Sequence, residues 1–255
     1  MSLPDKAGRE DPGADAREDP ARRAGQVRPF EVDPEVMAAI RPMGFHDAPE
    51  VAALHHAAMG KSLWARLGVR FLTQLYEGLV NNRRFLGFVY EERSRPPGQR
   101  IRGFIAGSQD SEAMFREVFR SRWFLLGPAA LPGLAHDPGV LRPLLQTARY
   151  FAASAPDVGV QVTAESLFCS FAPDLRGNRV SGHINKVLFD ELAARGHAFV
   201  KITTETDNEG ANRQLRSWGF ADRGRFRFYG KEMVVYLLDL AQSPRVQPTS
   251  RHPAV

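Results

Sequence analysis

The stretch from residue 164 to residue 220 limits the fold more than any other part of this chain. It reads AESLFCSFAPDLRGNRVSGHINKVLFDELAARGHAFVKITTETDNEGANRQLRSWGF. The apolar run at 167–171 predicts a buried strand, and a basic loop at 176–182 separates it from a helix that ends at Gly196. A second apolar run at 199–203 predicts another strand. A strand, a loop and a helix start together form the physical basis of a site for a phosphorylated cofactor, because a helix N-terminus presents free amides and partial positive charge.

Three anchors in this stretch resemble the GNAT acetyltransferase superfamily, whose members transfer an acetyl group from acetyl-CoA to an amine. The loop is similar to the family's Arg/Gln-x-x-Gly-x-Gly/Ala loop, and Gly196 lies at the usual separation from Arg176. The third anchor is the run Asn208-x-x-Ala211-Asn212 that leads into Gly219-Phe220. The resemblance implies a mixed α/β (α+β) fold, with a central twisted sheet of about seven strands flanked by helices.

The rest of the chain is expected to complete a single domain around this stretch. Residues 1–29 are rich in Pro, Gly, Ala and charged residues and have almost nothing apolar to bury, so we expect a disordered tail. Residues 242–255 are predicted to be a second, flexible tail. The domain then spans 30–241, and the 43% hydrophobic content of the chain suffices for a sizeable core.

Apolar spacing and turn residues predict further elements on both sides of the stretch. Asp47 is placed to cap a helix that reaches Ala58. The order of strand, two helices and antiparallel strands resembles the N-terminal half of the family. The predicted elements are strands at 39–42, 85–90, 101–108, 220–228 and 233–240 and a second helix at 67–80.

Residues 109–163 are predicted to be a helical insertion between the third and fourth strands. Helical spacing begins near 115–122, and a further helix is expected over 140–151. The aromatic and basic residues of this segment either roof an acceptor pocket or belong to helices that only pack on the sheet. The apolar run at 123–135 is broken by two prolines and is too short to span a bilayer.

Charge and cysteine content narrow the expected partners. A net charge of +5 and an isoelectric point near 9.6 suit an anionic partner such as CoA. The sequence has no basic run with interleaved aromatic residues, the pattern typical of nucleic-acid binding, so nucleic acid is not an expected partner. Cys169 is the single cysteine and lies in an apolar strand, so we expect a buried structural thiol. The histidines lack metal-ligand spacing, so no metal is expected. Without an apolar N-terminal segment or a membrane span, we expect a soluble, cytoplasmic protein.

By position, the resemblance places acetyl-CoA against the loop, the fourth strand and the start of the last helix. The family usually has glycine where Arg179 and Ser181 stand, so Arg179 either reaches the phosphates with its guanidinium or obstructs them. Asn208 lies near the arm of the cofactor, caps the helix that follows, or does both. The implied cofactor-binding residues are Ser170, Phe171, Ala172, Arg176, Gly177, Asn178, Arg179, Val180, Ser181, Gly182, Asn208 and Asn212.

Acetylation of an amine needs a general base, because an ammonium group has no lone pair. Glu165 matches a position where some members of the family place this base, and the alternative is a solvated glutamate at a strand end. The family often has a tyrosine, four residues before the glycine of Gly219-Phe220, that returns a proton to the leaving thiolate. Here that position is Leu215, and Ser217 and Tyr229 are the candidate substitutes.

These features favour an acetyl-CoA-dependent N-acetyltransferase that uses direct transfer in a ternary complex. The expected acceptor is a small-molecule amine such as an amino sugar or a biosynthetic intermediate, and a protein amine is the second class. Arg179, Ser181 and Leu215 motivate a rival, a non-catalytic acyl-CoA-binding or scaffolding protein of the same fold. An exposed sheet edge is compatible with a homodimer.

Overall fold

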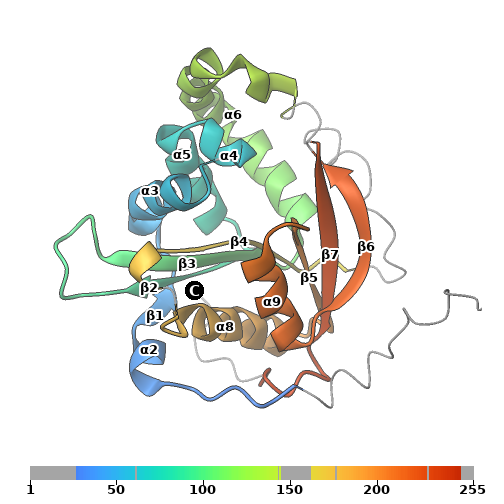
Figure 1. Cartoon of the computed structure of the whole chain (residues 1–255). Helices are drawn as coiled ribbons and strands as arrows, with labels where there is room; N and C mark the ends of the chain where they lie inside the picture. The colour runs from blue at the N-terminus through green and yellow to red at the C-terminus, as the bar shows by residue number, and fades with distance from the viewer. Residues whose placement is uncertain are drawn as a thin grey trace, which may run out of the picture.

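The computed structural model describes residues 27–60, 62–142, 144, 162–175, 177–228 and 230–247. One mixed sheet has the strand order β1-β2-β3-β4-β5-β7-β6 (Figure 1). Its strands are β1 (Ile40–Pro42), β2 (Phe85–Glu91), β3 (Ile101–Ser108), β4 (Glu165–Phe171), β5 (Phe199–Glu205), β6 (Ala221–Phe228) and β7 (Lys231–Asp239). The helices are α2 (Pro34–Ala38), α3 (Ala48–Ala58), α4 (Leu63–Arg66), α5 (Val69–Val80), α6 (Ser111–His136), α8 (Val180–Ala194) and α9 (Glu209–Trp218), with 3-10 turns η1 (Phe45–Asp47), η2 (Pro138–Val140) and η3 (Pro173–Leu175).

The predicted fold class is confirmed, with a seven-stranded sheet flanked by helices. Each predicted strand is present, and its ends differ from the prediction by no more than about two residues, the usual error of such boundaries. Neighbouring strands are antiparallel except β4 and β5, which run parallel because α8 carries the chain back across the sheet.

A separate hydrophobic core lies on each face of the sheet. Helices α3 to α6 cover one face and α8 and α9 cover the other (Figure 1). Successive side chains of a strand point to opposite faces, so Phe104 belongs to the first core and Ile105 to the second. Tyr76 of α5 packs edge-on against Phe104 in the first core, and Trp218 of α9 packs edge-on against Phe189 of α8 in the second. Both faces of the central strands are therefore buried, and their backbone edges are accessible only where two strands separate.

Such a separation lies between β4 and β5. These strands pair only at Glu165 with Lys201 and at Ser166 with Ile202. On the other edge of β4, the register with β3 shifts between Ala106 and Gly107, which leaves Leu167 as an additional residue. A β-bulge bends and twists its strand, and here it lies where the pairing with β5 stops. From Leu167 onward, β4 stays on β3 and leaves β5.

In the described part of the insertion, one helix continues through the apolar run that two prolines were expected to break. α6 continues from Ser111 to His136, through Pro128 and Pro132. Both prolines lie on the exposed side, where a tilted carbonyl can bond water in place of the missing amide. The non-helical dihedrals are instead at Arg122, with φ of −119° and ψ of 15°. Of the helix expected over 140–151, residues 143 and 145–151 lie outside the described residues.

Residues 27–29 and 242–247, assigned to loose tails from the sequence, pack instead against the domain. The guanidinium of Arg245 donates to the carbonyl of Arg28 over 2.9 Å, and Val246 is buried in the core beneath α8. The two segments cover each other and α9, so each has apolar contacts that its own composition does not reveal. Residues 1–26 and 248–255 lie outside the described residues.

Candidate functional site

A cavity of about 840 Å³ occupies the opening between β4 and β5. This volume is in the range of small-molecule sites. Residues 166–171 of β4 form one wall, and Ile202 to Thr204 of β5 begin the opposite wall. The first turns of α8 and one side of α9 line the lower part, while Ala58 and Met59 at the end of α3 line the upper part. The cavity therefore reaches both faces of the sheet.

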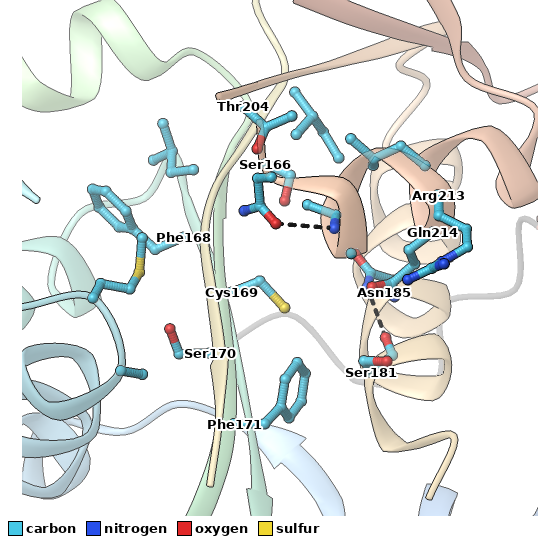
Figure 2. A pocket seen from close by; sticks show the side chains of 18 of the residues that line it. Ser166, Phe168, Cys169, Ser170, Phe171, Ser181, Asn185, Thr204, Arg213 and Gln214 are labelled. Atoms are coloured by element: carbon cyan, nitrogen blue, oxygen red, sulfur yellow. Dashed lines mark hydrogen bonds between the residues drawn. The ribbon is translucent and has the colours of Figure 1, made fainter. Parts of the chain in front are cut away.

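The β4 wall combines a backbone edge with two different sets of side chains. Because β5 has separated, the edge of β4 from Leu167 to Phe171 has no partner strand, although its other edge stays on β3. Cys169 and Phe171 point toward α8, whereas Phe168 and Ser170 point toward α3 (Figure 2). An extended ligand lying along this edge would find backbone donors and acceptors that the sheet leaves unused.

Cys169 corrects the expectation of a buried structural thiol. Its side chain is exposed, because it faces the cavity instead of the core. The walls of the cavity still surround the sulfur and keep bulk water from solvating a thiolate, and this desolvation raises the pKa of the thiol to about 12. Cys169 is therefore protonated near neutral pH and remains a poor nucleophile.

The N-terminus of α8 opens toward the lower part of the cavity without a side-chain cap. By contrast, Asp110 caps α6 and Asn208 caps α9. The amides of Val180 and Ser181 occupy the first turn of α8, where no intrahelical acceptor exists. These amides and the positive end of the helix dipole make this end of the cavity attractive to an anion.

Arg179 is the N-cap residue of α8 and adopts the left-handed conformation, with φ of 58°. It is the only described non-glycine residue with positive φ, a conformation that costs a side chain about 1 kcal/mol or more. Its guanidinium lies away from the cavity, 3.2 Å from Glu31 and over the ring of Phe30. Of the two alternatives from the sequence, obstruction is therefore absent in this conformation, and phosphate contact would require the side chain to turn.

The loop residues divide into two groups. Gly177 and Ser181 line the cavity, whereas Asn178, Arg179, Val180 and Gly182 do not. Val180 is buried beside Ala172 and Leu175, and a Cβ on residue 182 would lie 2.7 Å from the ring of Phe30. Arg176 lies outside the described residues.

The α9 wall adds polar groups at the same end. Asn208 lines the cavity, and its side-chain oxygen accepts from the amide of Ala211 over 3.2 Å. Asn212 does not line it, because its amide group donates to the carbonyls of Glu205, Thr206 and Asn208 and so fixes the turn before α9.

Arg213, which the sequence analysis missed, does line the cavity and extends toward Asn185 of α8 (Figure 2). Within the described part of the chain, its guanidinium makes no ion pair.

Comparison with known proteins supports the architecture built above. No family model matches the sequence, and no curated protein matches it. Solved structures do match. An N-acetyltransferase from Staphylococcus aureus Mu50 superposes with a TM-score of 0.50 at 15% identity, covering 79% of this chain and 97% of that one. A second structure, described as an acetyltransferase, gives a TM-score of 0.50 at 14% identity, covering 79% of this chain and 98% of that one.

The chain has the GNAT fold. The superposed proteins match it in backbone architecture, and at these identities the likeness concerns the fold alone. The resemblance carried by the loop, by Gly196 and by the Asn208 motif therefore predicted the fold correctly.

Within this GNAT fold, the predicted strand residues lie close together. Ser170 and Phe171 line the cavity, while Ala172 is buried and donates its amide to the carbonyl of Arg102 on β3. Several polar lining residues escaped the sequence analysis: Ser166, Asn185, Thr203, Thr204, Arg213 and Gln214. The available signals were local, since Asn185 follows Ser181 by one helical turn and Arg213 adjoins Asn212.

The predicted catalytic residues do not gather around the cavity. Glu165 lies where β4 and β5 are still paired, and it is not a lining residue. Its carboxylate accepts from the hydroxyl of Ser111 over 2.5 Å and lies 3.5 Å from the ammonium of Lys201. Ser217 is exposed on the outer side of α9, where its hydroxyl donates to the carbonyl of Gln214, whereas Leu215 does line the cavity. Tyr229 lies outside the described residues.

Among the described lining residues there is no aspartate, glutamate or histidine. His55 stands behind the β4 wall, fully buried, with its ring 5.0 Å from that of Phe168 and its Nδ1 2.7 Å from the Tyr76 hydroxyl. Burial lowers the pKa of His55 to about 4, so its ring is neutral near neutral pH. The described lining therefore provides neither a carboxylate nor an imidazole as a proton acceptor.

Two searches of the described residues had negative results. None of the described helices is both long and apolar enough to cross a membrane. In the same residues, no group of three or more His, Cys, Asp or Glu side chains is arranged to hold a metal ion.

The pKa of Cys169 generates a direct prediction. Alkylation by iodoacetamide should be slow at neutral pH and should rise about tenfold per pH unit up to about pH 10, because only the thiolate reacts. Whole-protein mass spectrometry measures the rate without ambiguity, since Cys169 is the single cysteine. A rate that levels off near pH 8.5, as for an ordinary thiol, would contradict the environment described here.

Proposed function

We propose that this protein is an N-acetyltransferase that moves an acetyl group from acetyl-CoA to an amine. One observation carries the proposal: the unpaired edge of β4 runs along a cavity whose lower end holds the uncapped start of α8. An extended chain with phosphates at one end matches both features. A helix start attracts the phosphates, and a strand edge bonds the amide-containing arm.

The described residues fit such a ligand. The amides of Val180 and Ser181, together with the guanidinium of Arg213, would hold the phosphates. The backbone of Cys169, Ser170 and Phe171 would bond the arm, which makes this contact insensitive to side-chain identity. The side chain of Asn185 also lines this part of the cavity, and it is held in place because its amide group donates to the carbonyl of Ser181 over 2.7 Å.

In this proposal, the reaction takes place where the cavity connects the two faces of the sheet. Acetyl-CoA supplies the acyl group as an activated thioester. A backbone amide of β4 would stabilise the negative charge that develops on the carbonyl oxygen during attack. The acceptor would approach from the α3 side, where Ala58, Met59 and Phe168 provide an apolar wall. Positioning of the two substrates on opposite sides of β4 would contribute most of the rate.

The acceptor in this proposal is a small-molecule amine, with a protein amine as the second class. The described lining contains no carboxylate to attract an ammonium group, which favours an amine that is neutral near physiological pH. Glu165 is the proposed base, and it would act through water because it does not line the cavity.

A second candidate, a non-catalytic acyl-CoA-binding protein, rests on a specific observation. Leu215 lines the cavity at the position of the family's proton-donating tyrosine, and Ser217 faces outward. Such a protein would bind acetyl-CoA without turnover when amines are supplied.

Calorimetric titration with acetyl-CoA, with free CoA as comparison, tests the proposed function. Both ligands should bind in the micromolar range, about −8 kcal/mol. Absence of binding at millimolar ligand would contradict both candidates. Binding without turnover across a panel of amino sugars, aryl amines and peptides would favour the second candidate.

Arg213→Ala should weaken binding of CoA about tenfold, because a guanidinium bonded to phosphate contributes about 1.5 kcal/mol in an exposed site. Arg216→Ala is the matched control, since Arg216 is on the same helix, is exposed and does not line the cavity. Calorimetry of both variants measures the effect. Equal affinities for the two variants would exclude Arg213 from the phosphate site.

Glu165→Gln should lower the turnover rate about 100-fold or more while the dissociation constant of acetyl-CoA stays unchanged, because the amide cannot accept a proton. The steady-state rate with an acceptor identified in the panel measures this. Glu117→Gln, an exposed carboxylate on α6, serves as the control. An unchanged rate would remove Glu165 as the base.

A further inference from the structure

Residues 27–33, here called the N-terminal strap, precede the sheet and run beneath α8 toward α2 (Figure 1). The strap contacts the same loop that begins α8, although it is about 150 residues away in sequence. It contacts the N-cap residue Arg179 and the first-turn residues Gly182 and His183 of α8. Its other contacts include Trp218 of α9 and Arg245.

His183 connects the strap to the left-handed residue. The amide of Asp33 donates to Nε2 of His183 over 2.8 Å, and Nδ1 lies 2.9 Å from the carbonyl of Arg179. A backbone amide can only donate, so Nε2 carries no proton and the hydrogen sits on Nδ1. The ring is fully buried, and both of its nitrogens are engaged in hydrogen bonds. It therefore fixes the carbonyl of Arg179 relative to the strap and is not available to phosphate.

Phe30 fills the space beside the loop. Its ring lies edge-on to His183 at 4.9 Å and is stacked on Trp218 at 5.6 Å. It also approaches Gly182 so closely that a Cβ there would lie 2.7 Å from the ring. The close approach of Phe30 thus accounts for a glycine at position 182.

The side chain of Arg179 is held by the same segment. Its guanidinium lies 3.2 Å from Glu31 and 5.9 Å from the centre of the Phe30 ring. The ion pair is exposed and contributes little alone, but together with the bond from His183 it holds both the side chain and the carbonyl of Arg179. These contacts stabilise a conformation that non-glycine residues rarely adopt.

We propose that the N-terminal strap is a positioning element for the phosphate end of the cavity. By holding Arg179 in the left-handed conformation, it orients the first-turn amides of Val180 and Ser181 toward the cavity in a loop that lacks the usual glycines. Phe30 and His183 are positioning residues, because they act through Arg179 and do not line the cavity. This inference rests on the proposed function.

The test compares Phe30→Ala with Phe119→Ala. Phe119 is also a partly buried ring, but it packs on Trp64 and Phe115 in the core on the other face of the sheet. If the strap keeps most molecules in the conformation that binds CoA, Phe30→Ala should lower the affinity for CoA about tenfold, as measured by calorimetry. Pantetheine, which lacks the phosphates, should bind both variants as it binds the wild type, as measured by NMR titration.

Unchanged affinity of Phe30→Ala for CoA would overturn the proposal, and so would an equal loss for CoA and pantetheine, which indicates general loosening. If Phe30→Ala does not fold, Phe30→Leu keeps most of the apolar volume while removing the ring contacts, and the same two titrations apply.

A ligand-free readout separates this inference from the proposed function. If the wild type does not bind CoA, the proposed function fails, and hydrogen exchange then tests the strap alone. The amides of Gly182 and His183, which donate to the carbonyl of Arg179, should exchange about tenfold faster in Phe30→Ala than in the wild type or in Phe119→Ala, because the start of the helix loses its support. Equal exchange rates in the three proteins would overturn the strap proposal.

Discussion

The separation of β4 from β5 is the constraint on which the rest of the site depends. Where helices cover both faces of a sheet, the backbone edges of its inner strands become accessible to a ligand only where two neighbouring strands part. Here the pairing stops after Ser166 and Ile202, and the bulge at Leu167 lies at the same point. The bulge places Leu167 and Phe168 together against the core on the α3 side, while Cys169 faces α8. Backbone geometry therefore makes the cavity and selects which side chains line it.

The lower end of the cavity relies on helix electrostatics more than on charged side chains. The start of α8 has no side-chain cap, and Arg213 is the one charged residue among the described lining. Arg179, one of the two arginines that the sequence places in the loop, is directed to Glu31 instead. The strain at Arg179 is compensated from outside the loop, through His183, Phe30 and Glu31. A loop with few glycines can thus keep the backbone shape that glycine otherwise permits.

The fold was predictable because its signals are local and repeated. Apolar runs predicted each strand, and Gly196 and Gly219, which have positive φ, mark the ends of α8 and α9 as expected. Three features were not predictable, because each depends on contacts distant in sequence. The sequence suggests a core position for Cys169, because it does not show that β5 separates from β4 beside this residue. Arg28 and Arg245 were both assigned to tails from the sequence, because nothing local indicates that they contact each other. Arg213 has the sequence context of a solvated helix residue, because its place in the cavity depends on β4 and α8, which lie far from it in sequence.

The most direct test of the account is hydrogen exchange of the intact protein with and without acetyl-CoA. The account predicts slower exchange at the unpaired edge of β4, residues 167–171, and at the first turn of α8, with no change in the edge strand β6. These are the places where free backbone groups would gain a partner. Protection confined to other elements, or absent from β4 at saturating ligand, would contradict the claim that the opening between β4 and β5 is the binding site.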